Sequence, residues 1–299
     1  MSKKTLLLGG QMPSLPGLEQ AITDAERLGF TTMQMLMLSN PYWMQHEIAT
    51  DQVKKFKDAR AKSNIKEIVG IDPYFARFGF SDLKHNEIMA ESIAHELVLC
   101  ESLDIPYLII HPGTCPLNSS SFECFSQMTS NIDVILSKAE NLGAKKCMII
   151  LQNMASPGKS LFYSFENMAR VFNESLYQDR IGFCFDMASA YASGYEFATK
   201  DDYEAMWQEI SRFIALDKIK VVHINDSQEP AGSEINFHAF IGKGKIPWEA
   251  YRLIMNDERF FDIPKIIEIP ATSLADYQES MRKLIDLLTP YNKQLFGLK

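Results

Sequence analysis

Cysteine is scarce in this sequence, and its spacing forms no recognisable framework. The five cysteines are odd in number and contain neither a CxxC pair nor a Cys/His zinc spacing. These absences argue against a secreted protein cross-linked by disulfides and favour a reducing, cytoplasmic setting. We therefore expect Cys115 to be a packed, unreactive thiol, the alternative being a soft metal ligand.

Long apolar runs and an excess of basic charge are also missing. No stretch approaches the roughly 18–20 uninterrupted apolar residues that a membrane-spanning helix needs, so we expect no membrane partner. The formal net charge is −8, whereas a nucleic-acid-binding protein usually carries a basic face. This charge counts modestly against DNA as a partner, but a local basic rim or a metal ion can still attract phosphate.

Short apolar runs rich in β-forming residues occur eight times, each followed by a longer segment with apolar residues at three- and four-residue steps. This alternation predicts parallel strands separated by helices, and eight repeats predict a closed (β/α)8 barrel. No linker divides the chain, so we expect one domain over 1–299, acting as a monomer. The predicted strands lie at 5–10, 31–38, 67–72, 106–111, 146–152, 181–186, 220–226 and 265–270. The predicted helices lie at 17–28, 52–61, 85–103, 121–142, 161–172, 202–216, 248–256 and 274–288.

Five of the predicted strands carry a polar side chain directly after a run of apolar residues, at the carboxyl end of the strand or within three residues of it. Barrel enzymes of this kind place their chemistry at the carboxyl ends of the strands, so these side chains should meet at one mouth. Histidines together with carboxylates are suitable ligands for a divalent metal ion. The residues concerned are His111, Gln152, Asp186, His223 and Glu268.

Several segments resemble, in order and spacing, the signature segments of the endonuclease IV family. The clearest are HPGT at 111–114, CFDMASAYASGYE at 184–196, the segment 223–246 and IEIP at 267–270. Weaker matches, which extend the resemblance over nearly the whole chain, are NPYW at 40–43, DPY at 72–74 and QNMASPG at 152–158. The resemblance implies a (β/α)8 barrel that binds DNA at abasic sites and cleaves the phosphodiester on the 5′ side with three zinc ions.

The resemblance also implies where the three metal sites would lie, and only the middle one is nearly intact. Its implied ligands are Asp186, His223 and Glu268, with Gln152 where the family has a bridging glutamate. The first site would use Ile71, His111 and Gln152, so one good ligand remains. The third would use Ser189, Asn236 and His238, where again one good ligand remains.

The loss of negative charge matches a loss of cations. Among the implied ligand positions, only Asp186 and Glu268 carry carboxylates, and two negative charges suit one divalent ion. We expect one Zn²⁺ or Mn²⁺ held by these two residues with His223 and Gln152, with His111 and His238 near enough to assist. Catalysis would then depend on Asp186, Glu268, His111 and Gln152.

The residues that would face DNA are altered as well. Tyr42 stands where the family has an arginine that enters the damaged helix, and Tyr74 matches a tyrosine that takes part in the same wedge. Lys159, Lys243 and Lys245 remain candidate phosphate contacts, whereas Glu234 stands where the family tends to have an arginine and would repel a phosphate backbone.

Three functions stay open at this point. The first is slow or altered metal-dependent hydrolysis of phosphodiesters in damaged DNA, as part of DNA repair. The second is a non-catalytic barrel that binds DNA or another partner. The third is a mononuclear isomerase or epimerase acting on a small sugar, although Gln152 cannot serve as the base that such an epimerase needs.

Overall fold

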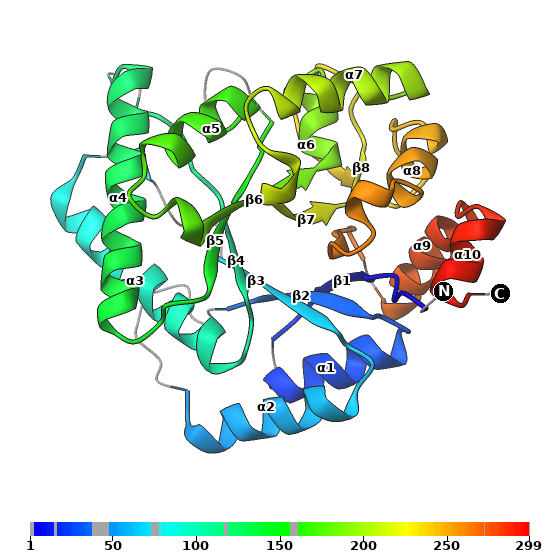
Figure 1. The fold of residues 1–299 in the computed structure, drawn as a ribbon, viewed down its shortest axis with the longest axis horizontal. Coiled ribbons are helices and arrows are strands. Elements are labelled where there is room, and N and C mark those ends of the chain that lie inside the picture. Colours follow the sequence, from blue (N-terminus) through cyan, green and yellow to red (C-terminus); the bar gives the residue numbers. More distant parts are fainter. Residues whose placement is uncertain are drawn as a thin grey trace.

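Eight parallel strands close into a barrel in the order β1-β10-β7-β6-β5-β4-β3-β2 (Figure 1). The computed structural model describes residues 3–14, 17–37, 48–72, 78–79, 81–116, 119–155, 161–271 and 273–298. Closure is made by β1, whose Leu8 lies opposite Lys265 while its Gln11 lies opposite Gln34. The predicted (β/α)8 barrel is confirmed. Its strands are β1 Leu8–Met12, β2 Thr32–Leu36, β3 Glu67–Ile71, β4 Tyr107–Ile110, β5 Met148–Gln152, β6 Ile181–Asp186, β7 Ile219–His223 and β10 Lys265–Ile267.

Helices surround the strands, and the two ends of the chain lie side by side next to α9 and α10 (Figure 1). There the backbone N–H of Lys4 donates to the carbonyl of Leu295 at 3.1 Å. The helices are α1 Leu18–Arg27, α2 Thr50–Lys62, α3 Leu83–Ser102, α4 Ser121–Asn141, α5 Phe165–Glu174, α6 Met187–Ala192, α7 Lys200–Ser211, α8 Trp248–Met255, α9 Leu274–Asp286 and α10 Pro290–Phe296. Short 3-10 turns are η1 Gln178–Arg180, η2 Leu216–Lys218 and η3 Glu258–Phe260.

The inside of the barrel is filled below the strand ends. Seven apolar side chains from six strands form a buried cluster there, separate from the larger core between strands and helices. Because these side chains pack the interior, polar chemistry is confined to the carboxyl ends of the strands. The cluster contains Val69, Ile71, Ile109, Ile150, Cys184, Val221 and Ile266.

Most predicted helix ends agree with the structure to within a few residues, but α5 begins at Phe165 rather than at 161. The side chain of Ser164 accepts a hydrogen bond from the backbone N–H of Asn167, so it caps the helix and sets its start. The short helix α6 and the terminal helix α10 were not predicted. Helix α6 has only six residues and begins directly after β6, and α10 follows α9 without an intervening strand.

Cys115 is a correction to the sequence-based expectation, because it is bonded to Cys124 rather than packed as a thiol. The bond joins the loop after β4 to the first turn of α4, with 5.9 Å between the two Cα atoms. A spacing of nine residues does not predict this disulfide, because the pairing depends on how the loop returns onto the helix. The remaining cysteines, Cys100, Cys147 and Cys184, are free and buried.

A small antiparallel pair, β8 Asp226–Ser227 and β9 His238–Ala239, fixes the long loop that follows β7. The buried carboxylate of Asp226 accepts hydrogen bonds from the backbone N–H groups of Gly242 and Gly244 at 2.8 and 2.9 Å. A side chain at position 244 would not fit, since an added Cβ would lie 2.3 Å from the Asp226 Oδ1 atom. The turn therefore holds β9, and His238 with it, over the mouth of the barrel.

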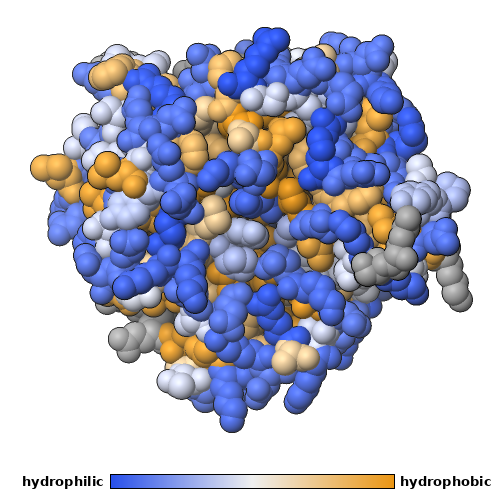
Figure 2. All heavy atoms as spheres, in the orientation of Figure 1, coloured by the Kyte–Doolittle hydropathy of each residue, from blue (hydrophilic) through white to orange (hydrophobic). Residues whose placement is uncertain are grey.

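Hydrophilic residues cover most of the face shown in Figure 2, with hydrophobic residues visible mainly between them. Within the part of the chain that the structure describes, no helix is both long enough and apolar enough to cross a membrane.

Candidate metal centre

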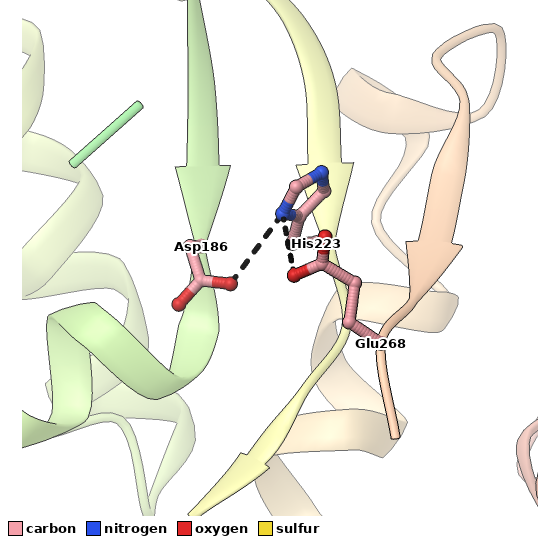
Figure 3. A group of neighbouring side chains, drawn as sticks. All are labelled: Asp186, His223 and Glu268. Carbon is pink, nitrogen blue, oxygen red and sulfur yellow. Dashed lines mark ion pairs between the residues drawn. The ribbon is translucent and has the colours of Figure 1, made fainter. Parts of the chain in front are cut away.

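Three strand ends bring Asp186, His223 and Glu268 together (Figure 3). Asp186 ends β6, His223 ends β7, and Glu268 directly follows β10. The Nδ1 atom of His223 lies 3.4 Å from Glu268 Oε2 and 3.6 Å from Asp186 Oδ2. All three side chains are buried, and one potential ligand atom from each lies within 4.8 Å of the others. The predicted convergence of these residues is therefore present.

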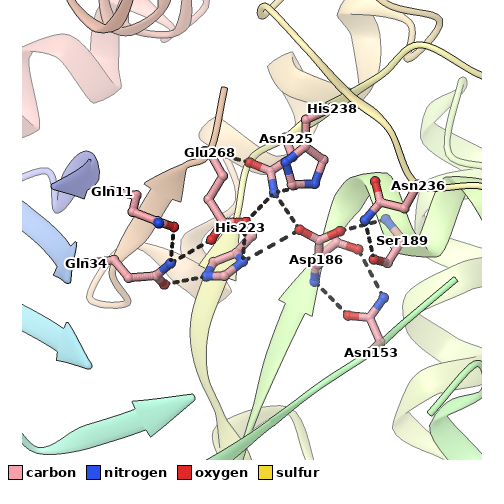
Figure 4. A network of polar contacts seen from close by, with 10 residues as sticks. All are labelled: Gln11, Gln34, Asn153, Asp186, Ser189, His223, Asn225, Asn236, His238 and Glu268. Atoms are coloured by element: carbon pink, nitrogen blue, oxygen red, sulfur yellow. Dashed lines mark hydrogen bonds and ion pairs between the residues drawn. The ribbon is translucent and has the colours of Figure 1, made fainter. Parts of the chain in front are cut away.

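The orientation of the His223 ring is set by Gln34, which reaches it across the barrel from β2 (Figure 4). The Gln34 amide nitrogen donates to Glu268 Oε1 at 2.6 Å and to Gln11 Oε1 at 3.2 Å. Its oxygen must then be the acceptor in the 2.8 Å contact with His223 Nε2, which makes that ring nitrogen the donor. In the neutral ring, Nδ1 consequently keeps its lone pair and directs it toward the two carboxylates.

Further amides hold the two carboxylates in place (Figure 4). Asp186 caps α6, because its Oδ1 accepts from the backbone N–H of Ser189 at 2.6 Å and leaves Oδ2 for the centre. The Asn153 side chain bonds both the N–H and the carbonyl of Asp186, at 2.6 and 3.0 Å. Asn225 donates to Asp186 Oδ2 at 2.6 Å and to Glu268 Oε2 at 3.1 Å, and it accepts from the Glu268 backbone N–H at 2.8 Å.

The electrostatics of the centre favour ionised carboxylates around a positive charge. Burial works to raise the pKa of Glu268, but the imidazoles of His223, His238 and His111 outweigh it and hold this pKa well below its usual range. Burial would also raise the pKa of Asp186, and the same two neighbours His223 and His238 lower it. For His223, burial would lower the pKa, but Cys184, Glu268 and Asp186 around the ring outweigh burial and raise this pKa well above its usual value. The two carboxylates therefore favour a positive charge between them, either a proton on the His223 ring or a metal ion that displaces it. Both acids are therefore ionised at neutral pH.

This arrangement fits a divalent metal ion. Within the described part of the chain, His223 Nδ1 is a buried nitrogen with no hydrogen-bond partner, and it faces two carboxylate oxygens. Carboxylate oxygens and imidazole nitrogen are ligands of Zn²⁺ and Mn²⁺, and metal-bound histidines ordinarily donate their other ring nitrogen to a fixing group, as His223 does to Gln34. Two carboxylates and an imidazole nitrogen that can give up its proton form a ligand set that a divalent ion accepts.

The other predicted ligands lie around the same mouth. His111, Gln152 and His238 line a cleft of about 630 Å³ together with Glu268. Burial lowers the pKa of His111 to about 4, so its ring is neutral near pH 7. The Gln152 Oε1 atom is buried and has no hydrogen-bond partner among the described residues. His238 Nε2 lies 3.4 Å from the amide nitrogen of Asn225.

The residues at the other ligand positions that the family resemblance implies supply no charged ligand atom. Ile71 is fully buried in the apolar cluster inside the barrel and offers no lone pair. Ser189 and Asn236 are bonded to each other instead: the Asn236 amide nitrogen donates to the Ser189 hydroxyl at 2.9 Å (Figure 4), while the Asn236 oxygen has no partner among the described residues. Where a third metal would be ligated, the described structure therefore has a neutral hydrogen bond.

The structure describes only some of the residues predicted to face DNA. Tyr42, Tyr74 and Lys159 lie outside the described residues. Lys243 is exposed on the turn after β9 and does not line the cleft.

Sequence reasoning missed the amides that orient the centre, chiefly Gln34 and Asn225. Gln34 interrupts the apolar run of β2, which is a signal that the sequence itself contains, and the structure shows that its side chain is completely buried. Asn225 lies two residues beyond the strand-ending His223 and is equally buried. A polar residue within or just after an apolar strand is buried and therefore needs hydrogen-bond partners. The polar side chains at the mouth of the barrel are those partners.

Comparison with known protein families places this chain clearly. Residues 22–289 match the family model described as "Xylose isomerase-like TIM barrel". A "Probable endonuclease 4" of Chloroflexus aggregans is 33% identical over 264 residues, covering 88% of this chain and 90% of the relative. An "Apurinic-apyrimidinic endonuclease" of Caenorhabditis elegans is 29% identical over 266 residues, covering 88% of this chain and 66% of the relative.

Among solved structures, endonuclease IV from Thermus thermophilus is similar with a TM-score of 0.81 and 24% sequence identity, covering 93% of this chain and 98% of that one. That likeness extends over the barrel and its helices and concerns the fold. Together with the matching family model and the sequence identity to curated relatives, it agrees with the signature segments found in the sequence. The chain belongs to the endonuclease IV family of xylose isomerase-like TIM barrels.

Proposed function

We propose that this protein hydrolyses phosphodiester bonds at abasic or otherwise damaged positions in DNA, with one divalent ion held by Asp186, His223 and Glu268. The observation that carries the proposal is the buried Nδ1 of His223, which has no hydrogen-bond partner among the described residues and faces two ionised carboxylates. DNA as the substrate is supported by the names of the relatives, which are endonucleases. Zn²⁺ and Mn²⁺ both suit this ligand set.

A divalent ion in such a site polarises a phosphate oxygen and lowers the pKa of water. The chain's own groups keep that reaction oriented: Asn225 holds the spacing of the two carboxylates, and Gln34 holds the His223 ring. His111 is neutral and can bind the ion or accept a proton within the cleft. The free Gln152 Oε1 can accept a hydrogen bond from water or assist the ion as a weak neutral ligand.

With one ion, activity should be slow compared with a three-metal member of the family. Several ions divide the activation of the nucleophile and the stabilisation of the leaving group among themselves, whereas one ion must serve both. Ile71 and the Ser189–Asn236 pair supply no charge for additional ions. We further propose that residues 1–299 work as one monomeric unit, because one chain supplies the whole centre; a cytoplasmic location stays a prediction.

A mononuclear sugar isomerase is a second candidate, because four carboxamides line the cleft beside the proposed ion. Such amides suit sugar hydroxyl groups. Against it, the only carboxylate among the described lining residues is Glu268, which is a proposed ligand, and Gln152 is not a base at neutral pH. The amides are those of Gln11, Gln152, Gln228 and Asn236.

A duplex with a synthetic abasic site tests the main proposal. We expect wild-type protein supplied with Zn²⁺ or Mn²⁺ to cut on the 5′ side, slowly, and to lose this activity after chelation. Glu268→Gln should abolish cutting, whereas Glu258→Gln, the same change at an exposed position in η3, should leave it intact.

Four outcomes would contradict the proposal. Cutting at the rate of a three-metal relative would refute the single-ion account. Undiminished cutting by Glu268→Gln would refute the metal centre. Absence of cutting by wild-type protein, with DNA binding retained, would favour the non-catalytic barrel, and solvent deuterium uptake into a ketose would favour the sugar enzyme.

A further inference from the structure

The wall of the cleft beside the metal centre is unusual for a site that receives DNA, because it contains no lysine or arginine among its described residues. Proteins that hold the phosphate backbone ordinarily do so with lysine and arginine. The wall instead combines amides with apolar and aromatic groups. Its residues are Gln11, His111, Gln152, Met154, Gln228, Asn236, Phe237, His238, Glu268, Ile269, Pro270 and Tyr277.

Phe237 is the exposed aromatic side chain of this wall. Its side chain is 59% exposed, although a phenylalanine ring is usually buried, and it lies between Asn236 and His238. The carboxamide oxygens of Gln152 and Asn236, on the same wall, are buried and have no hydrogen-bond partner among the described residues. An apolar ring face thus accompanies hydrogen-bond acceptors that a ligand with N–H or O–H groups could use.

The backbone around Phe237 is fixed on both sides. Its carbonyl accepts from the backbone N–H of Gln228 at 2.8 Å, and the Gln228 side chain donates to the carbonyl of His238 at 2.8 Å. The preceding side chain of Asn236 is bonded to Ser189 at 2.9 Å. The ring is therefore presented from a held segment, which reduces the entropy lost when a ligand contacts it.

We propose that Phe237 is a stacking platform for one unpaired nucleobase of the DNA strand whose phosphate lies at the metal centre. This proposal rests on the proposed function and defines its substrate as a strand with a base out of its helix. Every base has a flat π face, and the cleft volume of about 630 Å³ is in the range of small-ligand sites. Gln152 and Asn236 can accept hydrogen bonds from amino groups at a base edge.

Stacking and backbone charge make different predictions for salt dependence. Affinity built on phosphate contacts falls steeply with salt as counterions are released, whereas stacking on a neutral ring does not. The cleft wall offers no lysine or arginine within its described residues, and the whole chain carries a net charge of −8. We therefore expect the part of the affinity that Phe237 contributes to persist when the salt concentration is raised.

The test is binding of a single-stranded oligonucleotide that carries the fluorescent base 2-aminopurine, measured with metal-loaded protein. Phe237→Leu should weaken binding about tenfold and reduce the quenching that stacking causes. Phe237→Trp, which keeps an aromatic face, should restore both. Phe213→Leu is the matched control, because Phe213 is also exposed but lies after α7, at the opposite end of the barrel.

Equal affinity and quenching for wild-type protein and Phe237→Leu would overturn the platform, as would an equal loss in Phe213→Leu. A defect in Phe237→Leu that vanishes at high salt would also overturn it. Incision of abasic duplex is measured in parallel, so that the two proposals can fail separately. Incision without any dependence on Phe237 refutes the platform alone, whereas aromatic-dependent binding without incision refutes the proposed hydrolysis and leaves the platform standing.

Discussion

Two neighbouring groups of polar side chains at the mouth of the barrel differ in their charge and in their hydrogen bonding. In the first, formed by Asp186, His223 and Glu268, a buried ring nitrogen lies between two carboxylates and has no hydrogen-bond partner in the part of the chain that the structure describes. In the second, Ser189 and Asn236 are neutral, and they bond each other at 2.9 Å. Asp186 belongs to both neighbourhoods, since its Oδ1 caps the helix that carries Ser189.

The difference shows what a metal site needs beyond suitable residue types. The first group keeps negative charge and a surrounding set of amides that fixes the direction of every ligand, whereas the second is uncharged and leaves the Asn236 carboxamide oxygen without a partner among the described residues. A buried polar group without a partner is costly, so one that persists requires an explanation such as a bound ion. In the second group the unpartnered oxygen belongs to a neutral amide, which an N–H or O–H group of a ligand can satisfy without an ion.

The largest expected effect comes from removing charge from the first group. Asp186→Asn keeps the shape of the side chain and its cap on α6 but removes one of the two charges, so metal affinity should fall by more than about 100-fold. Titration with a metal-sensitive dye measures this. Asp179→Asn, at an exposed position in η1, is the control and should bind normally; similar affinities in both variants would break the comparison.

A smaller effect is expected from the amides behind the first group. Gln34→Leu removes the acceptor for His223 Nε2 and the donor to Glu268, so metal affinity should fall by about 10–100-fold. Gln178→Leu at an exposed position is the control. The melting temperature of the metal-free protein separates misfolding from lost orientation: an unchanged affinity in a folded Gln34→Leu protein would show that the amide is dispensable.

The smallest effect, and the sharpest test of the comparison, is a gain. The double change Ser189→His with Asn236→Asp restores an imidazole and a carboxylate beside His238, and we expect it to raise bound metal from one to two equivalents. Incision should rise by roughly a factor of ten or less, because a second ion can share the work of the first. Each single change should leave one equivalent of bound metal. A double variant that also binds only one equivalent would show that charge and ligand atoms alone do not create a second metal site.

Much of the fold could be predicted because barrel strands and helices have strong local patterns. The eight apolar runs predicted the strands, and the carboxyl-end rule predicted that Asp186, His223 and Glu268 converge. The prediction worked because a closed parallel barrel puts all of these strand ends on one face. The resemblance further implies that Ile71, Gln152, Ser189 and Asn236 stand where the family has metal ligands, which stays a prediction.

The remainder depended on contacts that no local pattern encodes. Gln34 meets His223 only because the barrel closes, across 189 residues of sequence. The Cys115–Cys124 bond depends on the path of a loop, and the presentation of Phe237 depends on a two-residue strand pair too short to show alternation. Such features follow from tertiary packing and turn geometry rather than from residue periodicity.

The central claim is that one divalent ion occupies the centre formed by Asp186, His223 and Glu268. Elemental analysis of protein purified without added metal tests it most directly. We predict about one equivalent of Zn²⁺ or Mn²⁺ in the wild-type protein and almost none in Glu268→Gln, since one carboxylate cannot balance a buried dication. Three equivalents in the wild-type protein, or an unchanged content in Glu268→Gln, would contradict the account.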